Sequence, residues 1–197
     1  MKKTIIYLTP LVCCLNAFAD WSQWTIAVGG NGHYYQAVSV PGSISWFSAE
    51  AQAESMGGTL ATITSAAEND FVHSLIASNP AFWETIGGDT RGVWLGGYQP
   101  AGSPEPGGGW TWVTGEAFSY QNWASAEPND TAGGGTSNYI QYFGRGPNNC
   151  ANTWNDIWPD AGAGQPLGFI VEVVPEPGVG ALLGLGLGSL LLRRRGR

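Results

Sequence analysis

Residues that could bind a divalent cation gather in two short segments in the second half of the chain. Glu127 and Asn129 flank Pro128, and Asn155 is followed directly by Asp156. Each segment therefore offers one carboxylate and one amide, and Ca²⁺ binds through roughly six to eight oxygen ligands of these kinds. Because residues two apart share a face of an extended chain, Glu127 and Asn129 can meet one ion. A cis peptide bond at Pro128 would sharpen the loop that brings them together.

The same residue types also suit an ordinary surface loop. Asn, Asp, Gly and Pro are the residues that turns and loops favour, and the chain contains 30 Gly and 12 Pro. From composition alone, a surface loop without a metal remains the alternative to a Ca²⁺ site. His33 and His73 have no nearby partners for a zinc site, and no serine lies in a Gly-x-Ser-x-Gly motif.

Two helices and a strand are predicted in the first half of the chain. Residues 33–40 are aromatic and β-branched, which indicates a strand. Apolar residues between positions 46 and 56 recur at spacings of three and four, which predicts a helix that stops at Gly57-Gly58. Ser65 and Glu68 form a capping box for a second helix, expected to end at residues 79–80.

After residues 93–97 the helical signals stop and short extended segments alternate with long loops. An extended link at 60–63 comes before this half, and the later candidate strands are 110–113, 139–143 and 169–174. This order predicts an α+β domain with a loop-rich second half and with both ends side by side. Aromatic residues dominate cores, so the core is expected to contain Trp94, Trp110, Trp112 and Trp154.

In order and spacing, these segments resemble the C-type lectin domain. The resemblance covers residues 33–174 and rests on Trp-Leu-Gly at 94–96, Trp-x-Trp at 110–112, Asn-Trp at 122–123, Glu-Pro-Asn (EPN) at 127–129 and Trp-Asn-Asp (WND) at 154–156. It implies a C-type lectin-like fold, with two helices, short antiparallel strands and a long loop-rich region. It also implies that Glu127, Asn129, Asn155 and Asp156 hold one Ca²⁺ and bind two vicinal hydroxyls of a sugar.

The EPN tripeptide implies a preference for equatorial 3- and 4-hydroxyls, as in mannose, glucose, fucose or N-acetylglucosamine. The chain departs from the family at Ser137 and Asn138, where a further Glu is usual, and the missing carboxylate should weaken Ca²⁺ binding. The usual disulfides are also missing, since Ala53 stands where a helix Cys is expected. A second Ca²⁺ site, which would use a residue like Asp130, is not expected.

The N-terminus has the pattern of a secretory signal peptide. Lys2 and Lys3 precede an apolar stretch at 5–15, and small residues at 17 and 19 predict cleavage before Asp20. Residues 1–19 are therefore assigned to a signal peptide and residues 20–174 to the lectin-like domain. A lipoprotein signal is the alternative, because two cysteines lie at positions 13 and 14. After cleavage Cys150 alone would remain, so no internal disulfide could form.

The C-terminal residues 175–197 resemble the PEP-CTERM sorting signal of Gram-negative bacteria. A Pro-Glu-Pro motif is followed by an apolar stretch at 178–192 and by three arginines at 193–195. The resemblance implies processing by an exosortase in the inner membrane and delivery to the cell surface or an exopolysaccharide matrix. The alternative is an ordinary single-span anchor, and an unprocessed chain would stay membrane-anchored.

The charge balance excludes one class of partner. Between Asp20 and Val174 the chain has two basic and fourteen acidic residues, a net charge of about −12. Nucleic acid is excluded because too few positive charges face its phosphates. The sequence thus predicts an exported, Ca²⁺-dependent carbohydrate-binding protein that is not an enzyme. The alternatives are a structural or adhesive matrix protein with the same fold but no such binding, and a hydrolase using paired carboxylates.

Overall fold

The computed structural model describes residues 21–130, 136–160, 162 and 166–175. The expected signal peptide and nearly all of the expected sorting segment lie outside these residues. Within the described ranges, no helix combines the length and apolar character needed to cross a bilayer. The apolar stretch at 178–192 lies outside the described residues.

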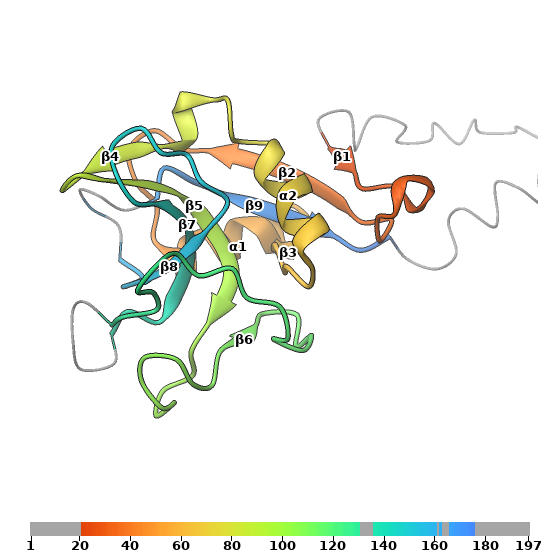
Figure 1. The fold of residues 1–197 in the computed structure, drawn as a ribbon. Coiled ribbons are helices and arrows are strands. Elements are labelled where there is room, and N and C mark those ends of the chain that lie inside the picture. Colours follow the sequence, from red (N-terminus) through yellow and green to blue (C-terminus); the bar gives the residue numbers. More distant parts are fainter. Residues whose placement is uncertain (1–20, 131–135, 161, 163–165, 176–197) are drawn as a thin grey trace, which may run out of the picture.

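One mixed sheet organises the described chain (Figure 1). Its strands are β1 (Ser22–Gln23), β2 (Tyr34–Ser39), β3 (Thr59–Leu60), β4 (Glu84–Ile86), β5 (Asp89–Tyr98), β6 (Thr111–Trp112), β7 (Tyr139–Gly144), β8 (Trp154–Ile157) and β9 (Gly168–Val173). The order is β1-β2-β9-β5-β7-β8, with β3 paired to β9 and with β4 and β6 paired to β5. The pairs are antiparallel except β5–β9, which is parallel at Trp94 and Phe169. The sheet is therefore mixed, whereas the family resemblance had implied antiparallel strands.

Both predicted helices are present, and each begins at a serine cap, of which only Ser65 was predicted. Helix α1 (Trp46–Ser55) begins where the Ser45 hydroxyl accepts a hydrogen bond from the Ser48 amide, and α2 (Ala66–Ser74) where Ser65 accepts from Glu68. Helix α2 stops at Ser74, earlier than predicted, because the next amides bond three residues back and tighten the turn. Short 3-10 turns form at Ile26–Val28 (η1) and Pro80–Phe82 (η2).

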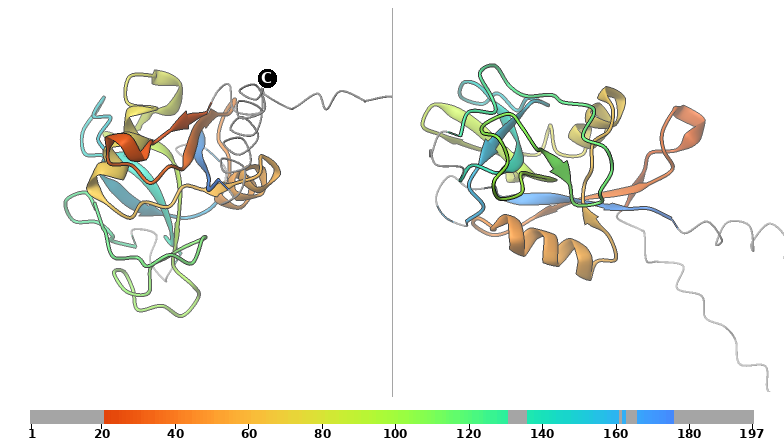
Figure 2. Two further views of the ribbon diagram at one scale, coloured as in Figure 1. Left: turned by 90° about the vertical axis from the view of Figure 1, so that its right-hand side faces the viewer. Right: turned by 90° about the horizontal axis from the view of Figure 1, so that it is seen from below.

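The two helices cover opposite faces of the β2–β9 region (Figure 2, right). Alternating strand residues divide the core accordingly. On the α1 face the buried residues include Trp46, Ala49, Ala53, Leu60, Trp94 and Phe169. On the α2 face they include Val72, Ile76, Val93, Leu95, Trp112 and Trp154. The four tryptophans expected in the core are all buried there.

Strands from the two ends of the domain lie side by side, as predicted. Strand β2 runs antiparallel to β9 along its whole length, from the pair Tyr34–Val173 to the pair Ser39–Gly168. Strand β8 was not expected, because a four-residue Trp-Asn-Asp-Ile segment has no period-two alternation of apolar and polar residues. It forms the edge of the sheet beside β7, with Asn155 opposite Gln141.

Candidate functional site

The EPN segment is held beside the WND strand by backbone hydrogen bonds. The Ala124 amide donates to the Trp154 carbonyl at 2.8 Å, and the Trp154 amide donates to the Asn122 carbonyl at 2.9 Å. The loop therefore runs alongside edge strand β8 and forms a parallel bridge between Trp123 and Trp154. The bond between Glu127 and Pro128 is cis, as the sequence suggested.

Asp156 joins the two segments through both of its carboxylate oxygens. Its Oδ1 accepts a hydrogen bond from the Asn129 amide at 2.8 Å, and its Oδ2 accepts one from the Asp130 amide at 2.6 Å. The residue is only 3% exposed. Because charge-assisted bonds to backbone amides are strong, Asp156 fixes the end of the EPN loop on β8.

Glu127 points inward and is nearly inaccessible, with a side chain that is 2% exposed. Its Oε1 accepts a 2.6 Å hydrogen bond from Nη2 of Arg145, whereas its Oε2 is buried and receives no hydrogen bond. Burial raises the pKa of Glu127 to about 8, and the neighbouring carboxylate of Asp156 adds to this rise, against the influence of Arg145. The carboxylate of Asp156 is therefore close enough to Glu127 to influence its protonation.

The two asparagines are placed differently. Asn155 is 8% exposed; its Nδ2 donates to the Asp156 carbonyl at 3.3 Å, and its Oδ1 is buried without a partner. The backbone amide of Asn129 donates to Asp156, and the residue as a whole is exposed. The structure therefore gathers Glu127, Asp156 and the Asn129 backbone directly, with Asn155 beside them on β8.

Ser137, which stands in place of the usual Glu, is connected to the same site through Asp130. The amides of Thr136 and Ser137 both donate to Asp130 Oδ1 at 3.2 Å. Ser137 is 1% exposed and its hydroxyl oxygen is buried without a partner. The segment thus supplies a neutral oxygen and no negative charge.

These residues fit a Ca²⁺ ion on chemical grounds. Three residues around the site each have a buried oxygen without a hydrogen-bond partner: Glu127 Oε2, Asn155 Oδ1 and Ser137 Oγ. Leaving such atoms buried and unpaired is costly, and a hard cation would compensate them. In the described part of the chain, no group of three or more His, Cys, Asp and Glu side chains could hold a metal. An ion here would depend on neutral amide oxygens beside two carboxylates.

Two further charged residues border this site and were not identified as site residues from the sequence. Arg145 follows β7 and contacts Glu127. Glu105 lies in the loop after β5. Desolvation contributes most to the rise in its pKa, and the negative charges of Asp130 and Asp156 add to it. Arg145 was recognisable only as one of two basic residues in the body. Neither residue stands at a spacing that connects it to the EPN or WND segment.

A second pair of buried carboxylates lies on the α2 side of the sheet. Glu68, at the start of α2, is 1% exposed. Its Oε1 accepts hydrogen bonds from the Tyr35 hydroxyl at 2.6 Å and from Asn31 Nδ2 at 2.8 Å. Its Oε2 accepts from the amide and hydroxyl of Thr64 at 2.7 and 2.8 Å. The carboxylate thus bonds to Thr64 and does not return to the cap residue Ser65.

Glu172 of β9 completes this second pair. Its Oε1 lies 2.6 Å from His33 Nδ1 and 3.1 Å from the Tyr35 hydroxyl oxygen, and its Oε2 accepts from the Thr62 amide at 2.8 Å. Burial raises the pKa of Glu172, and the hydrogen bond to Glu172 raises the pKa of His33 against the effect of burial. All four oxygens of this pair therefore have donors within the protein.

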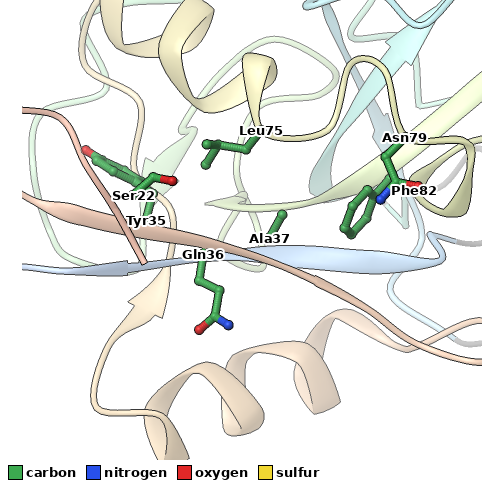
Figure 3. Close-up of a pocket in the computed structure, with 7 residues that line it drawn as sticks. All are labelled: Ser22, Tyr35, Gln36, Ala37, Leu75, Asn79 and Phe82. Atoms are coloured by element: carbon green, nitrogen blue, oxygen red, sulfur yellow. The ribbon is translucent and has the colours of Figure 1, made fainter. Parts of the chain in front are cut away.

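A shallow hollow of about 270 Å³ lies between β2, α2 and η2 (Figure 3). The residues around it are Ser22, Tyr35, Gln36, Ala37, Leu75, Asn79 and Phe82. Figure 3 shows Leu75 and Phe82 approaching it from α2 and η2, across from Ala37 on β2. These lining residues include no carboxylate, histidine or cysteine.

Comparison with known proteins identifies relatives over most of this domain. A family model described as "Lectin C-type domain" matches residues 42–158. Ladderlectin of Oncorhynchus mykiss is 34% identical over 89 residues, which are 45% of this chain and 41% of ladderlectin. The galactose-specific lectin nattectin of Thalassophryne nattereri is 33% identical over 87 residues, 44% of this chain and 48% of nattectin. The chain thus spans less than half of each curated relative.

The same fold also occurs in an antifreeze protein. The crystal structure of a calcium-independent type II antifreeze protein superposes with a TM-score of 0.55 and 20% identity, covering 79% of this chain and 92% of that chain. At this identity the likeness concerns the fold alone. The same arrangement of helices and strands is therefore found in a protein described as independent of calcium.

Proposed function

The chain belongs to the C-type lectin domain family, and we propose that it is an exported protein that binds carbohydrate through Ca²⁺. The observation that supports this most directly is the set of three buried oxygens without partners, on Glu127, Asn155 and Ser137. They belong to the two segments that Asp156 holds together and to the segment that Asp130 ties to them. A bound Ca²⁺ would supply these oxygens with a positive charge and coordinate two neighbouring hydroxyls of a sugar.

The side chains would then orient the sugar around the ion. A carboxylate oxygen that binds the metal keeps a lone pair free to accept a hydrogen bond, so Glu127 and Asp156 would accept from sugar hydroxyls. The amide groups of Asn129 and Asn155 would donate to the same hydroxyls. This division into acceptors and donors matches two vicinal hydroxyls, each of which donates once and accepts once.

The preference that we propose is for mannose- or glucose-type sugars, which have equatorial 3- and 4-hydroxyls. The EPN tripeptide at 127–129 supports it, through the family resemblance. Nattectin, one of the two relatives above, is described as galactose-specific. Galactose is therefore the competing ligand that a binding test must include.

Export and sorting are part of the proposal. Residues 1–19 would direct secretion, and an exosortase would recognise residues 175–197 during a transient insertion of the apolar stretch 178–192 into the inner membrane. The product would reside at the cell surface or in an exopolysaccharide matrix. Mass spectrometry of the protein from its producing cells should find Asp20 as the first residue and the arginines at 193–195 removed.

One observation supports a second candidate, a structural or adhesive matrix protein without Ca²⁺-dependent sugar binding. Ser137 brings no negative charge to the site, so the candidate ligands include only two carboxylates. Fewer charged ligands give weaker Ca²⁺ binding. A protein of the same fold, the type II antifreeze protein above, is calcium-independent.

Calorimetric titration of the purified protein distinguishes these candidates. Ca²⁺ is added first, followed by mannose or galactose, for the wild type, Asn155→Ala and the control Gln52→Ala, which removes an exposed amide on α1. We expect mannose binding only with Ca²⁺ and only in the wild type and the control. Sugar binding that persists in EDTA would contradict the mechanism, and no Ca²⁺ binding at millimolar concentration would favour the structural role.

The same samples test for hydrolysis. Glu127 and Asp156 also form the kind of carboxylate pair that glycoside hydrolases use. A binding protein releases no new reducing ends from a glycan over a long incubation, whereas a hydrolase does. We expect none.

A further inference from the structure

Arg145 binds several segments around the candidate site at once. Its Nη2 donates to Glu127 Oε1 at 2.6 Å, and its Nε and Nη2 both donate to the Ser125 carbonyl, at 3.2 and 3.1 Å. Its Nη1 lies 3.5 Å from Asp89 Oδ2 at the start of β5, and the guanidinium carbon lies 5.3 Å from the centre of the Phe143 ring. One side chain therefore ties the EPN loop to β5 and β7.

The two ends of this ion pair differ in their exposure. The Arg145 side chain is 46% exposed, whereas that of Glu127 is 2% exposed. Arg145 thus approaches from the solvent side and occupies the Oε1 oxygen, leaving Oε2 buried without a partner. Because a planar guanidinium forms several hydrogen bonds in fixed directions, it sets the orientation of the carboxylate as well as its charge.

We propose that Arg145 is a positioning residue that acts as an internal counter-cation for Glu127. It holds the EPN loop in its binding geometry before any metal arrives, and it shares the charge of Glu127 with the ion that binds at Oε2. Because Arg145 has already ordered the loop, Ca²⁺ binding adds little to the stability of the protein by ordering it further. The statement about the ion rests on the proposed function, whereas the statement about the loop does not.

Within the described part of the chain, one other basic side chain of this length is present. Between residues 21 and 175 the sequence contains no lysine and one other arginine, Arg91. The guanidinium of Arg91 lies 6.0 Å from the centre of the Trp158 ring. Arg91→Gln removes the same charge from the same domain, and it is therefore the matched control.

The test compares the wild type, Arg145→Gln, Arg145→Lys and the control Arg91→Gln in EDTA and in Ca²⁺. Hydrogen exchange is followed at the amides of Asn129 and Asp130, which donate to Asp156 and are exposed when the loop opens. In EDTA we expect exchange of these amides to become at least about tenfold faster in Arg145→Gln than in the wild type, the scale of a charged hydrogen bond. Arg145→Lys should recover part of the protection, and Arg91→Gln should match the wild type.

In Ca²⁺, protection in Arg145→Gln should return, and the rise in melting temperature on adding Ca²⁺ should exceed that of the wild type. Unchanged exchange in EDTA for Arg145→Gln would overturn the proposal. A smaller Ca²⁺-induced rise than in the wild type would overturn the shared-charge part of it. If Ca²⁺ changes none of the four proteins but Arg145→Gln still opens in EDTA, the proposed function fails while the positioning role stands.

Discussion

The protein buries two pairs of carboxylates, and the two pairs are treated in opposite ways. Glu68 and Glu172 have a donor for each of their four oxygens, from hydroxyls, amides and His33. In the pair of Glu127 and Asp156, the inward oxygen of Glu127 has no donor, and neutral oxygens nearby are also unpaired. Both pairs are polar and buried, so burial alone does not distinguish them.

The difference shows which pair is complete without a ligand. A buried polar group whose bonds are all made stabilises one conformation, whereas one that lacks a partner costs free energy until something supplies it. We infer that the Glu68–Glu172 pair is structural, fixing the start of α2 to β2 and β9. The Glu127–Asp156 pair is the one that the protein leaves incomplete, as a ligand site requires.

The largest expected effect is on the structural pair. Glu68→Ala should lower the free energy of unfolding by about 3 kcal/mol, because it leaves the Tyr35 hydroxyl and the Thr64 amide without their acceptor. Urea denaturation in EDTA measures it, with Glu68→Gln as the control that keeps the shape and one acceptor. A loss below about 1 kcal/mol would show that this network is not structural.

The next effect concerns the pH dependence of Ca²⁺ binding. The pKa of Glu127 is raised to about 8, by burial first and then by Asp156, so below that pH the ion must displace a proton. The apparent Ca²⁺ affinity should rise by up to about tenfold per pH unit toward pH 8 and level off above it. Calorimetry across this range tests it, and an affinity independent of pH would contradict the assignment of Glu127 as a ligand.

A smaller effect is expected when Glu127 itself is changed without metal. Because the pKa of Glu127 is raised, its pH-dependent contribution to folding is fully present below its ordinary pKa and is lost as the pH rises through about 8. At neutral pH, Glu127→Gln should therefore change the unfolding free energy by less than about 1 kcal/mol, while abolishing stabilisation by Ca²⁺. Thermal and urea unfolding, with and without EDTA, measure both; a large loss in EDTA would make this pair structural too.

The smallest effect is a shift of stability with pH at His33. Its hydrogen bond to Glu172 raises its pKa, so its stabilisation is fully present below pH 6.5 and is lost as the pH rises through the higher folded-state value. His73 behaves oppositely, since burial lowers its pKa and its contribution is lost as the pH falls. His33→Asn should remove the loss of stability above pH 6.5, and His73→Asn should not. If stability varied with pH in the same way in both variants, the opposite roles of His33 and His73 would be refuted.

Much of the fold follows from local patterns in the sequence. Spacings of three and four between residues 46 and 56 gave α1 its start and its buried face, because a helix places such residues on one side. The strands β2, β7 and β9 correspond to the segments 33–40, 139–143 and 169–174 that β-branched and aromatic residues had indicated. Strand β8 was missed, since an edge strand of four residues is defined by its partner β7 more than by its own composition.

The candidate site divides in the same way. The EPN and WND segments could be found because their residue types are suited to a cation and stand in a recognisable order. Arg145 and Glu105 could not be found, because their approach to the site depends on loops whose path no local pattern describes. Arg145 and Glu127 are 18 positions apart in the sequence, and only the folded structure shows that Arg145 binds Oε1 of Glu127.

The sequence alone therefore determined the family and the two helices, and it identified the four residues that could bind an ion. The tertiary structure decided which carboxylates have donors and which do not. The physical reason is that side-chain type sets the number of hydrogen bonds a group needs, while only the packed fold decides how many of them are made. Glu68 and Glu127 are the same amino acid, and their neighbours in space make one a structural anchor and the other a candidate ligand.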